Sequence, residues 1–205
     1  MFFLLIISVN QPNQSNQCSI SSMDLAEKNI VLIGMRGSGK TTVGAILAGR
    51  LHRELIPMDA LIVYEAGMTI PQIVDTYGWP RFRAIEAQVT QKVARLQGII
   101  NATGGGIVLN PENIKALRAT GIVFWLNVSV DYILQRIGED PNRPSLTGKA
   151  SRRDDMLATF VEREPLYRQA AHYIIDTDQK SQAQIAEEIV NILQEQESSR
   201  KAAKT

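Results

Sequence analysis

Residues 34–41 read Gly-Met-Arg-Gly-Ser-Gly-Lys-Thr, which matches the phosphate-binding loop pattern G-x-x-x-x-G-K-[ST]. An apolar run of strand length at 29–33 precedes the pattern, and residues 42–51 with helical spacing of apolar side chains follow it. The pattern therefore lies at a strand-to-helix turn, where glycine backbone N–H groups and a helix N-terminus can surround phosphate. This context favours nucleotide binding over an incidental glycine-rich turn.

The loop assigns a role to each polar side chain at its end. Lys40 can reach the β- and γ-phosphates of a nucleotide, and the Thr41 hydroxyl can ligate Mg²⁺. The nucleotide contacts expected from this segment are Gly37, Ser38, Gly39, Lys40, Thr41 and Thr42.

Length and charge limit the possible classes of protein. The 205 residues suffice for one α/β domain with a core, and a formal net charge of +1 gives no case for a nucleic acid or an anionic membrane as partner. The single cysteine, Cys18, excludes an internal disulfide framework and fits a reducing compartment, so a cytoplasmic location is expected.

The first 22 residues differ in composition from the rest of the chain. The apolar run at 2–7 is too short to span a bilayer and has no basic residue before it, and the polar run at 10–17 favours disorder. We expect residues 1–22 to be an N-terminal extension and Met23 to be the natural start. A weak export signal is the alternative. The domain is expected at 23–196, with a frayed tail at 197–205.

Apolar patterning alternates between strands and helices along the domain. Strands are expected at 29–33, 54–56, 99–102, 121–126 and 173–175. Helices are expected at 42–52, 111–119, 129–137, 152–169 and 181–195, and a mostly helical segment at 58–97, broken near Gly67 and Gly78. Pro111 suits a first helical turn, and Ser129 suits an N-cap. This order predicts an α/β fold with a parallel sheet covered on both faces. The segment at about 138–151 is rich in Pro, Gly and charge and is expected to be a mobile loop, and its functional interpretation is a lid over the nucleotide.

Five further motifs follow the loop in a fixed order: Met58-Asp59, Phe82-Arg83-x-x-Glu86, Gly104-Gly105-Gly106, Asn142-Arg143-Pro144-x-Leu146 and Arg163-x-Pro165-Leu166-Tyr167. Together with the loop they resemble the shikimate kinase family, over about residues 29–195. The resemblance implies a five-stranded parallel sheet in the order 2-3-1-4-5, as in P-loop kinases of the nucleoside-monophosphate-kinase type. It also implies transfer of the γ-phosphate of ATP to the 3-hydroxyl of shikimate, with one Mg²⁺ per subunit. A monomer is expected.

The residues of the acid-binding end each have a functional and a structural interpretation. Asp59 follows the second strand, where a carboxylate either binds a substrate hydroxyl as a base or caps a helix. Arg83 and Glu86 are three apart, so they form either a carboxylate-binding fork or an exposed surface pair. Arg163 lies in a charged run and leaves the same choice open. The resemblance implies substrate contacts for Asp59, Arg83, Arg163 and the glycines Gly104, Gly105 and Gly106.

Three more residues are expected on the nucleotide side. Arg143 is either a solvated charge or a lid cation that reaches the transferring phosphoryl group when the lid closes. The resemblance implies that Arg136 stacks on adenine and that Lys180 contacts the nucleotide. The expected catalytic residues are thus Lys40, Asp59 and Arg143.

The chain departs from the family pattern at three positions. Pro57 replaces the first aspartate of the family's Asp-x-Asp, which predicts weaker Mg²⁺ retention. Trp79 stands where an acidic residue is common, and Gln182 where a proline often contacts adenine.

Two other functions stay open at this point. Gluconate is also a polyhydroxy carboxylate, so another small-metabolite kinase such as a gluconate kinase also fits Asp59 and Arg83. Pro57 alone favours a shikimate-kinase-like protein that has lost catalysis and serves as a binding partner.

Overall fold

Strands and helices alternate along the computed structural model, which describes residues 27–137 and 151–202. The strands are β1 (Asn29–Ile33), β2 (Leu55–Pro57), β3 (Ile100–Ala102), β4 (Gly121–Asn127) and β5 (Tyr173–Asp176). The helices are α1 (Lys40–Leu51), α2 (Met58–Ala66), α3 (Ile70–Val93), the 3₁₀ turn η2 (Ile107–Leu109), α4 (Pro111–Thr120), α5 (Val130–Ile137), α6 (Arg152–Ala170) and α7 (Gln182–Ala202). The predicted elements are confirmed, and η2 is an addition that the sequence pattern did not indicate.

The five strands form one parallel sheet in the order β2-β3-β1-β4-β5, as predicted. The strand β1 occupies the centre, where Val31 pairs with Asn101 on one side and with Val123 on the other. Because all strands run the same way, their carboxyl ends meet at one edge of the sheet. The phosphate-binding loop and the segments after β2, β3 and β5 therefore converge at this edge.

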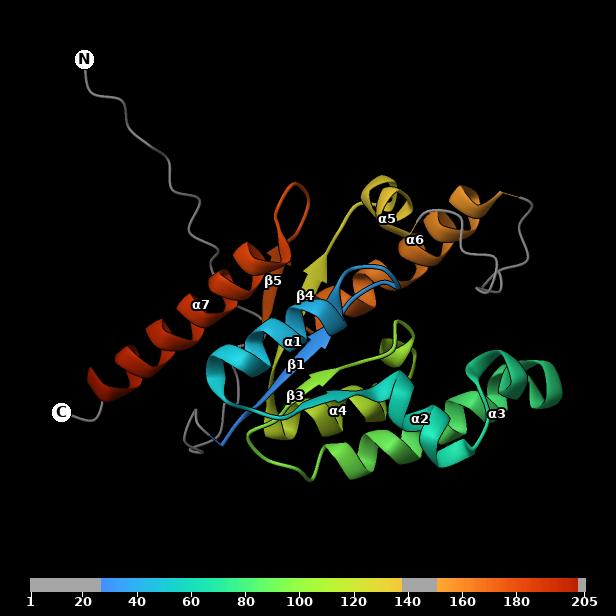
Figure 1. Ribbon diagram of the computed structural model, residues 1–205, viewed down its shortest axis with the longest axis horizontal. Coiled ribbons are helices and arrows are strands. Elements are labelled where there is room, and N and C mark those ends of the chain that lie inside the picture. The colour runs from blue at the N-terminus through green and yellow to red at the C-terminus, as the bar shows by residue number, and fades with distance from the viewer. Residues whose placement is uncertain (1–26, 138–150, 203–205) are drawn as a thin grey trace, which may run out of the picture.

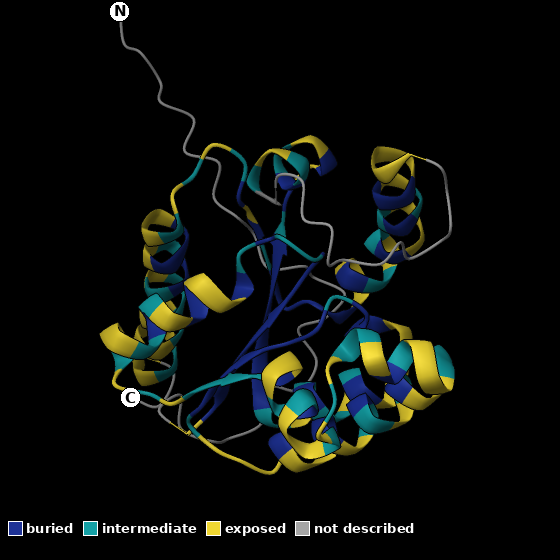
Figure 2. Ribbon diagram, turned by 45° about the vertical axis from the view of Figure 1, so that its right-hand side comes forward, coloured by how far each residue is buried: buried dark blue, intermediate teal, exposed yellow. Residues whose placement is uncertain are grey.

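Helices cover both faces of the sheet (Figure 1). Ile30 and Leu32 of β1 pack in a core with α1 and α7, whereas Val31 and Ile33 pack in a second core with α2–α6. Burial on both faces explains why the strands read as continuous apolar runs. Figure 2 shows the buried strands between helices whose outer faces are exposed.

Local signals place several helix ends where the sequence predicts them. The hydroxyl of Ser129 accepts a hydrogen bond of 3.3 Å from the Tyr132 N–H, which confirms the expected cap of α5. Pro111 opens α4 as expected, after the capping residue Asn110. The predicted break in the second helical segment lies at Gly78, whose φ of 78° and ψ of 169° interrupt α3. Since this backbone region favours glycine, the glycine at position 78 accounts for the break.

The C-terminal helix is longer than predicted. The helix α7 continues to Ala202, so the predicted helix end at 195 is wrong, and the frayed tail stays a prediction. Glu197 and Lys201 form an ion pair of 2.7 Å at i,i+4 spacing on this extension. Such a pair, together with basic residues in the last turn, stabilises a helix C-terminus even where no apolar residue marks it.

Some predictions concern residues outside the described ranges. They are the N-terminal extension with its start at Met23, Arg143, and the lid loop apart from Ser151. Ser151 caps α6 through a 3.3 Å hydrogen bond that its hydroxyl accepts from the Asp154 N–H. Of the helices in the described part of the chain, none combines the length and the apolar character that a membrane span requires.

A buried histidine joins α6 to the sheet. The Nδ1 atom of His172 accepts a 2.9 Å hydrogen bond from the Val123 N–H, so this nitrogen has to be unprotonated. Burial, followed by the charges of Arg118 and Lys28, lowers the pKa of His172 to about 4. The unfolded chain therefore binds this proton at a higher pH than the folded chain does. Stability from His172 is complete above the ordinary pKa of about 6.5 and is lost as the pH falls toward 4.

We expect the free energy of unfolding to fall by ~2 kcal/mol between pH 7 and pH 5 because of His172 alone. His172→Asn should remove most of this dependence of stability on pH, because the Asn side chain does not titrate. The Asn side-chain oxygen can still accept the hydrogen bond from the Val123 N–H. Urea unfolding at the two pH values measures the effect. The other histidine of the chain, the exposed His52, provides the control His52→Asn. An equal slope in wild type and His172→Asn would contradict the assignment.

Candidate active site

The phosphate-binding loop connects β1 to α1, as the sequence predicts. Gly34 and Gly39 have positive φ values of 142° and 90°. A Cβ on Gly34 would also lie 2.7 Å from the carbonyl oxygen of Leu126 on β4, so both the backbone and the available space require glycine there. Gly39 is the N-cap of α1, whose first turn carries no acidic residue. The positive end of this helix thus faces the loop without a competing carboxylate.

Lys40 is held on the inner side of the loop. Its side-chain Nζ donates hydrogen bonds to the carbonyl oxygens of Gly34 at 2.9 Å and Met35 at 2.8 Å, and to the hydroxyl of Ser38 at 3.3 Å. Ser38 itself is fully buried, so its hydroxyl supports the lysine rather than facing the cleft. The ammonium group is therefore fixed against the backbone of the loop whose pattern is typical of phosphate binding.

Asp59 lies in the first turn of α2, just beyond β2, and is exposed to the cleft. The N-cap of α2 is Pro57, which makes no side-chain cap, so the alternative that Asp59 caps this helix is wrong. A Cβ on Gly104 would lie 2.8 Å from Asp59 Oδ1 and 3.1 Å from Glu86 Oε1. The absent side chain at Gly104 thus leaves the space in which two carboxylates face the cleft.

Arg83 and Glu86 form a partly buried ion pair on α3. Arg83 Nη1 lies 2.6 Å from Glu86 Oε2, and the Glu86 side chain is only 1% exposed. The alternative of an ordinary surface pair is therefore wrong. Burial raises the pKa of Glu86, while the charge and the hydrogen bond of Arg83 oppose that rise. Within the described residues, Glu86 Oε1 has no hydrogen-bond partner.

The guanidinium group of Arg83 rests on the third glycine of the triplet. A Cβ on Gly106 would lie 2.1 Å from Arg83 Nη2 and 2.4 Å from Cζ. The φ of Gly106 is −99°, which any residue adopts, so space rather than backbone conformation requires glycine there. The rings of Trp79 and Phe82 also face the guanidinium group, with centroids 5.5 and 5.0 Å from Cζ. Arg83 is thus fixed by an ion pair, two rings and a glycine backbone.

Arg163 approaches the same triplet from α6. It is 8% exposed, and its Nη1 donates a 3.3 Å hydrogen bond to the carbonyl oxygen of Gly105. The interpretation of Arg163 as a solvated charge is therefore wrong. Its Nε atom is buried and lacks a hydrogen-bond partner within the described residues. A buried cation with an unused donor beside a cleft is suited to an anionic ligand.

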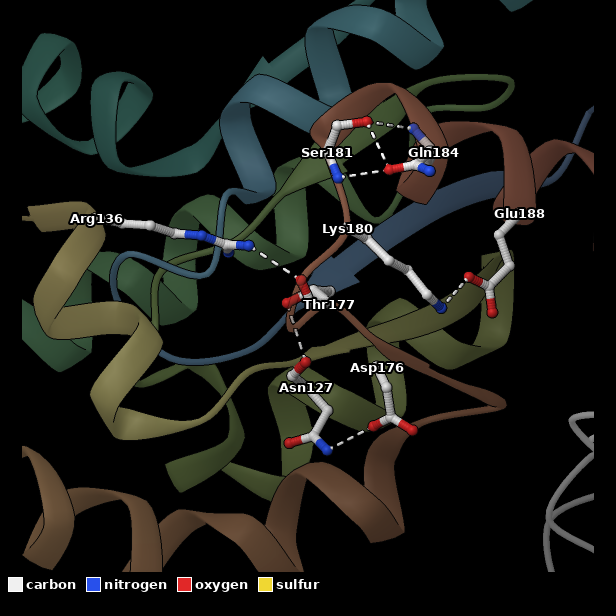
Figure 3. Close-up of polar contacts among 8 residues, drawn as sticks. All are labelled: Asn127, Arg136, Asp176, Thr177, Lys180, Ser181, Gln184 and Glu188. Atoms are coloured by element: carbon white, nitrogen blue, oxygen red, sulfur yellow. Dashed lines mark hydrogen bonds and ion pairs between the residues drawn. The ribbon is translucent and has the colours of Figure 1, made fainter.

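Arg136 also lines the cleft, beside the loop after β5 (Figure 3). Arg136 on α5 donates a 3.0 Å hydrogen bond from Nη2 to the carbonyl oxygen of Thr177, and its Cζ lies 5.7 Å from the Tyr132 ring centroid. Thr177 is itself anchored to β4, because its N–H and hydroxyl both donate to the Asn127 carbonyl oxygen, at 2.8 and 3.0 Å. Arg136 is thereby held beside the cleft, with Nη1 buried and without a partner in the described part of the chain.

Lys180 lies apart from this arrangement. Its Nζ forms a 2.6 Å ion pair with Glu188 Oε2, and the side chain extends toward α7 on the side of the loop away from Arg136 (Figure 3). Among the described residues it is not part of the cleft lining. A contact between Lys180 and a nucleotide stays a prediction, and this geometry gives the lysine a protein partner instead.

One cleft of about 760 Å³ brings the other predicted residues together. Of the predicted site residues, those that line it are Gly37, Gly39, Lys40, Thr41, Thr42, Asp59, Arg83, Gly104, Gly105, Gly106, Arg136 and Arg163. The three positions that depart from the family pattern, Pro57, Trp79 and Gln182, line it as well. The loop end and the glycine-triplet end therefore belong to a single continuous site.

Comparison with known proteins identifies the family of the chain. The family model described as shikimate kinase matches residues 36–194. The chain belongs to the shikimate kinase family. A curated shikimate kinase from Caldicellulosiruptor bescii is 39% identical over 84% of this chain and 99% of its own length. One from Pelotomaculum thermopropionicum is 42% identical over 82% of this chain and 96% of its own length.

A solved structure agrees with this membership of the shikimate kinase family. It is described as shikimate kinase from Acinetobacter baumannii in complex with shikimate. It superposes with a TM-score of 0.79 at 36% identity, over 83% of this chain and 94% of that one. The P-loop kinase fold, with its sheet order, is therefore shared.

The structure adds cleft residues that reasoning from the sequence missed. They are Met35, Arg36, Ile70, Pro71, Ala102 and Thr103. Arg36 occupies a variable position of the loop pattern, and Ile70 and Pro71 open α3 after its cap at Thr69. Only Thr103, directly before the glycine triplet, had a signal in the sequence.

The ion pair between Arg83 and the buried Glu86 can be tested by stability measurements without substrate. Arg83→Met should lower the free energy of unfolding at pH 7 by ~2 kcal/mol, because it leaves a buried carboxylate without its main partner. Adding Glu86→Gln should recover most of this loss. Urea denaturation measures both effects.

An exposed pair with the same spacing serves as the control. Lys115 and Glu112 are also three apart, at 3.8 Å, and their side chains are 79% and 72% exposed. Lys115→Met should therefore cost less than ~0.5 kcal/mol. Equal effects of Arg83→Met and Lys115→Met would contradict the role of burial.

Proposed function

We propose that the protein transfers the γ-phosphoryl group of ATP to the 3-hydroxyl of shikimate. The product is shikimate 3-phosphate, an intermediate in the synthesis of chorismate and the aromatic amino acids. One observation carries this proposal: the same cleft holds a phosphate-binding loop at one end and two fixed arginines around a glycine triplet at the other. A phosphate donor and a hydroxy acid would thus meet inside it.

The acid-binding end supplies orientation. Arg83 and Arg163 bind the carboxylate of the substrate, because two rigid guanidinium groups suit a planar carboxylate. The glycine triplet lets the substrate ring approach the backbone closely. Asp59 accepts a hydrogen bond from the 3-hydroxyl and takes its proton as the oxygen attacks.

The nucleotide end supplies charge stabilisation. The loop N–H groups and Lys40 bind the phosphates, and Arg136 stacks on the adenine beside the loop after β5. The lid cation Arg143 lies outside the described residues, and its contact with the transferring group stays a prediction. Since phosphoryl transfer needs little covalent help from protein, positioning and charge supply most of the rate enhancement.

The residues at the loop fit a Mg²⁺ ion that enters with the nucleotide. Thr41 presents its hydroxyl at an exposed position of the cleft, whereas the nearby wall position 57 is a proline. In the described part of the chain, no group of three or more His, Cys, Asp or Glu side chains is placed so that it could hold a metal ion. Mg²⁺ commonly keeps several waters and needs few protein ligands. When bound, it neutralises charge on the β- and γ-phosphate oxygens.

Assembly and location extend this proposal. A monomer in the cytoplasm is what we expect of the working enzyme. Gel filtration at assay concentrations tests the first expectation, and fractionation of cells that produce the protein from its own locus tests the second.

The proposal is tested by ADP release from the full chain with MgATP and shikimate, gluconate or no acceptor. We expect release that depends on shikimate. Asp59→Asn should lower kcat at least ~100-fold, because it removes the base while keeping the shape of the side chain. Release with gluconate alone would favour another small-metabolite kinase. If neither shikimate nor gluconate stimulates ADP release but shikimate still binds, the result would favour a non-catalytic binding protein.

Position 57 makes a separate prediction about the metal. Pro57→Asp adds a carboxylate to the cleft wall at the N-cap of α2, where Asp is also favourable for the helix. We expect the half-saturating Mg²⁺ concentration in the ADP assay to fall severalfold, while KM for shikimate changes little. An unchanged Mg²⁺ titration would remove the link between position 57 and the ion.

A further inference from the structure

The side chains of Tyr167 and Arg163 donate hydrogen bonds to the same carbonyl oxygen. They are four residues apart on α6, so they lie one turn apart on one face of the helix. Arg163 Nη1 donates to the Gly105 carbonyl oxygen at 3.3 Å, and the Tyr167 hydroxyl donates to the same oxygen. The middle carbonyl of the glycine triplet is thus fixed by two donors from one helix.

The Tyr167 hydroxyl also lies where the triplet meets the phosphate-binding loop. It is 3.8 Å from the sulfur of Met35, a weak contact with the loop. A Cβ on Gly105 would lie 3.1 Å from the Arg36 backbone nitrogen and 3.5 Å from the Gly34 carbonyl oxygen. The triplet therefore packs closely on the loop, and the Tyr167 hydroxyl lies at their junction.

Burial keeps this hydroxyl protonated. Tyr167 is 0% exposed, and burial raises its pKa to about 12, against the opposing influence of the nearby Arg163 and Arg83 charges. The hydroxyl therefore donates its hydrogen bond throughout the physiological range of pH. It does not exchange protons with a substrate, and it lies beneath the cleft rather than in its lining.

We propose that Tyr167 is a positioning residue for the acid-binding end: its hydroxyl fixes the Gly105 carbonyl, and through it the Arg163 guanidinium group that binds the substrate carboxylate. This inference rests on the proposed function. The aromatic ring has a separate, structural role, because it stacks on Trp125 with a centroid distance of 5.7 Å and an interplanar angle of 21°. Removing only the hydroxyl separates the two roles.

The chain offers a matched control on the other face of β4, the strand that carries Trp125. Tyr173 stacks on Phe124 with a centroid distance of 5.3 Å and an angle of 22°, and it is 8% exposed. Phe124 and Trp125 are neighbours on β4 and belong to the two opposite cores. Tyr173→Phe thus removes a hydroxyl from an equivalent stack that does not line the cleft.

The experiment compares Tyr167→Phe, Tyr173→Phe and wild type as full chains. For Tyr167→Phe we expect the Kd of shikimate, by calorimetry, and its KM to rise 5- to 20-fold, with KM for MgATP within twofold of wild type. For Tyr173→Phe both constants should stay within twofold. Thermal unfolding midpoints should be similar in the two variants, which separates loss of positioning from loss of stability.

A double-mutant cycle tests whether the effect passes through Arg163. In an Arg163→Met background, Tyr167→Phe should change the Kd of shikimate less than twofold, because the guanidinium group it orients is gone. A shikimate Kd for Tyr167→Phe equal to that of Tyr173→Phe would overturn the inference. An effect of Tyr167→Phe that persists undiminished without Arg163 would also overturn it. Wild type without shikimate-dependent ADP release would instead disprove the proposed function.

Discussion

Three missing side chains make the cleft possible. Gly104 leaves room for the carboxylates of Asp59 and Glu86, and Gly106 leaves room for the guanidinium group of Arg83. Gly105 packs against the backbone of the phosphate-binding loop. Since none of the three has a positive φ, the requirement for glycine comes from what surrounds them and not from the turn that they form.

The second constraint is the cost of burying charge. Lys40, Glu86 and Arg163 are each less than 10% exposed, and each is balanced by carbonyl groups or an opposite charge. This balance is incomplete at three side-chain atoms of residues that line the cleft. Glu86 Oε1, Arg163 Nε and Arg136 Nη1 are buried without partners within the described residues, and all three residues line the cleft. Buried polar atoms normally find partners, so these three atoms fit a site prepared for polar ligands. The side-chain amides of Asn101 and Asn113 are also buried without partners within the described residues, but they lie outside the cleft lining.

Most of the fold followed from local patterns. Sheet membership and most helix boundaries followed from apolar periodicity and from Pro, Ser and Gly signals, because these features act within a few residues. The sheet order came from the family resemblance. The extended end of α7 escaped prediction, since a solvated helix held by ion pairs carries no apolar stripe. The turn η2 escaped for a related reason, because a short run between two motifs has no periodicity to detect.

The sequence by itself determined the phosphate-binding loop, the alternation of strands and helices, and the identity of the residues that meet at the sheet edge. Each of these depends on residue type and spacing along the chain. Only the tertiary structure excluded a helix cap for Asp59, an exposed surface pair for Arg83 and a solvated charge for Arg163, since burial and partners are set by elements distant in sequence. The same holds for Tyr167, whose hydroxyl donates to a carbonyl 62 residues away. Such contacts arise when parallel strands bring their carboxyl ends together, and no local pattern records them.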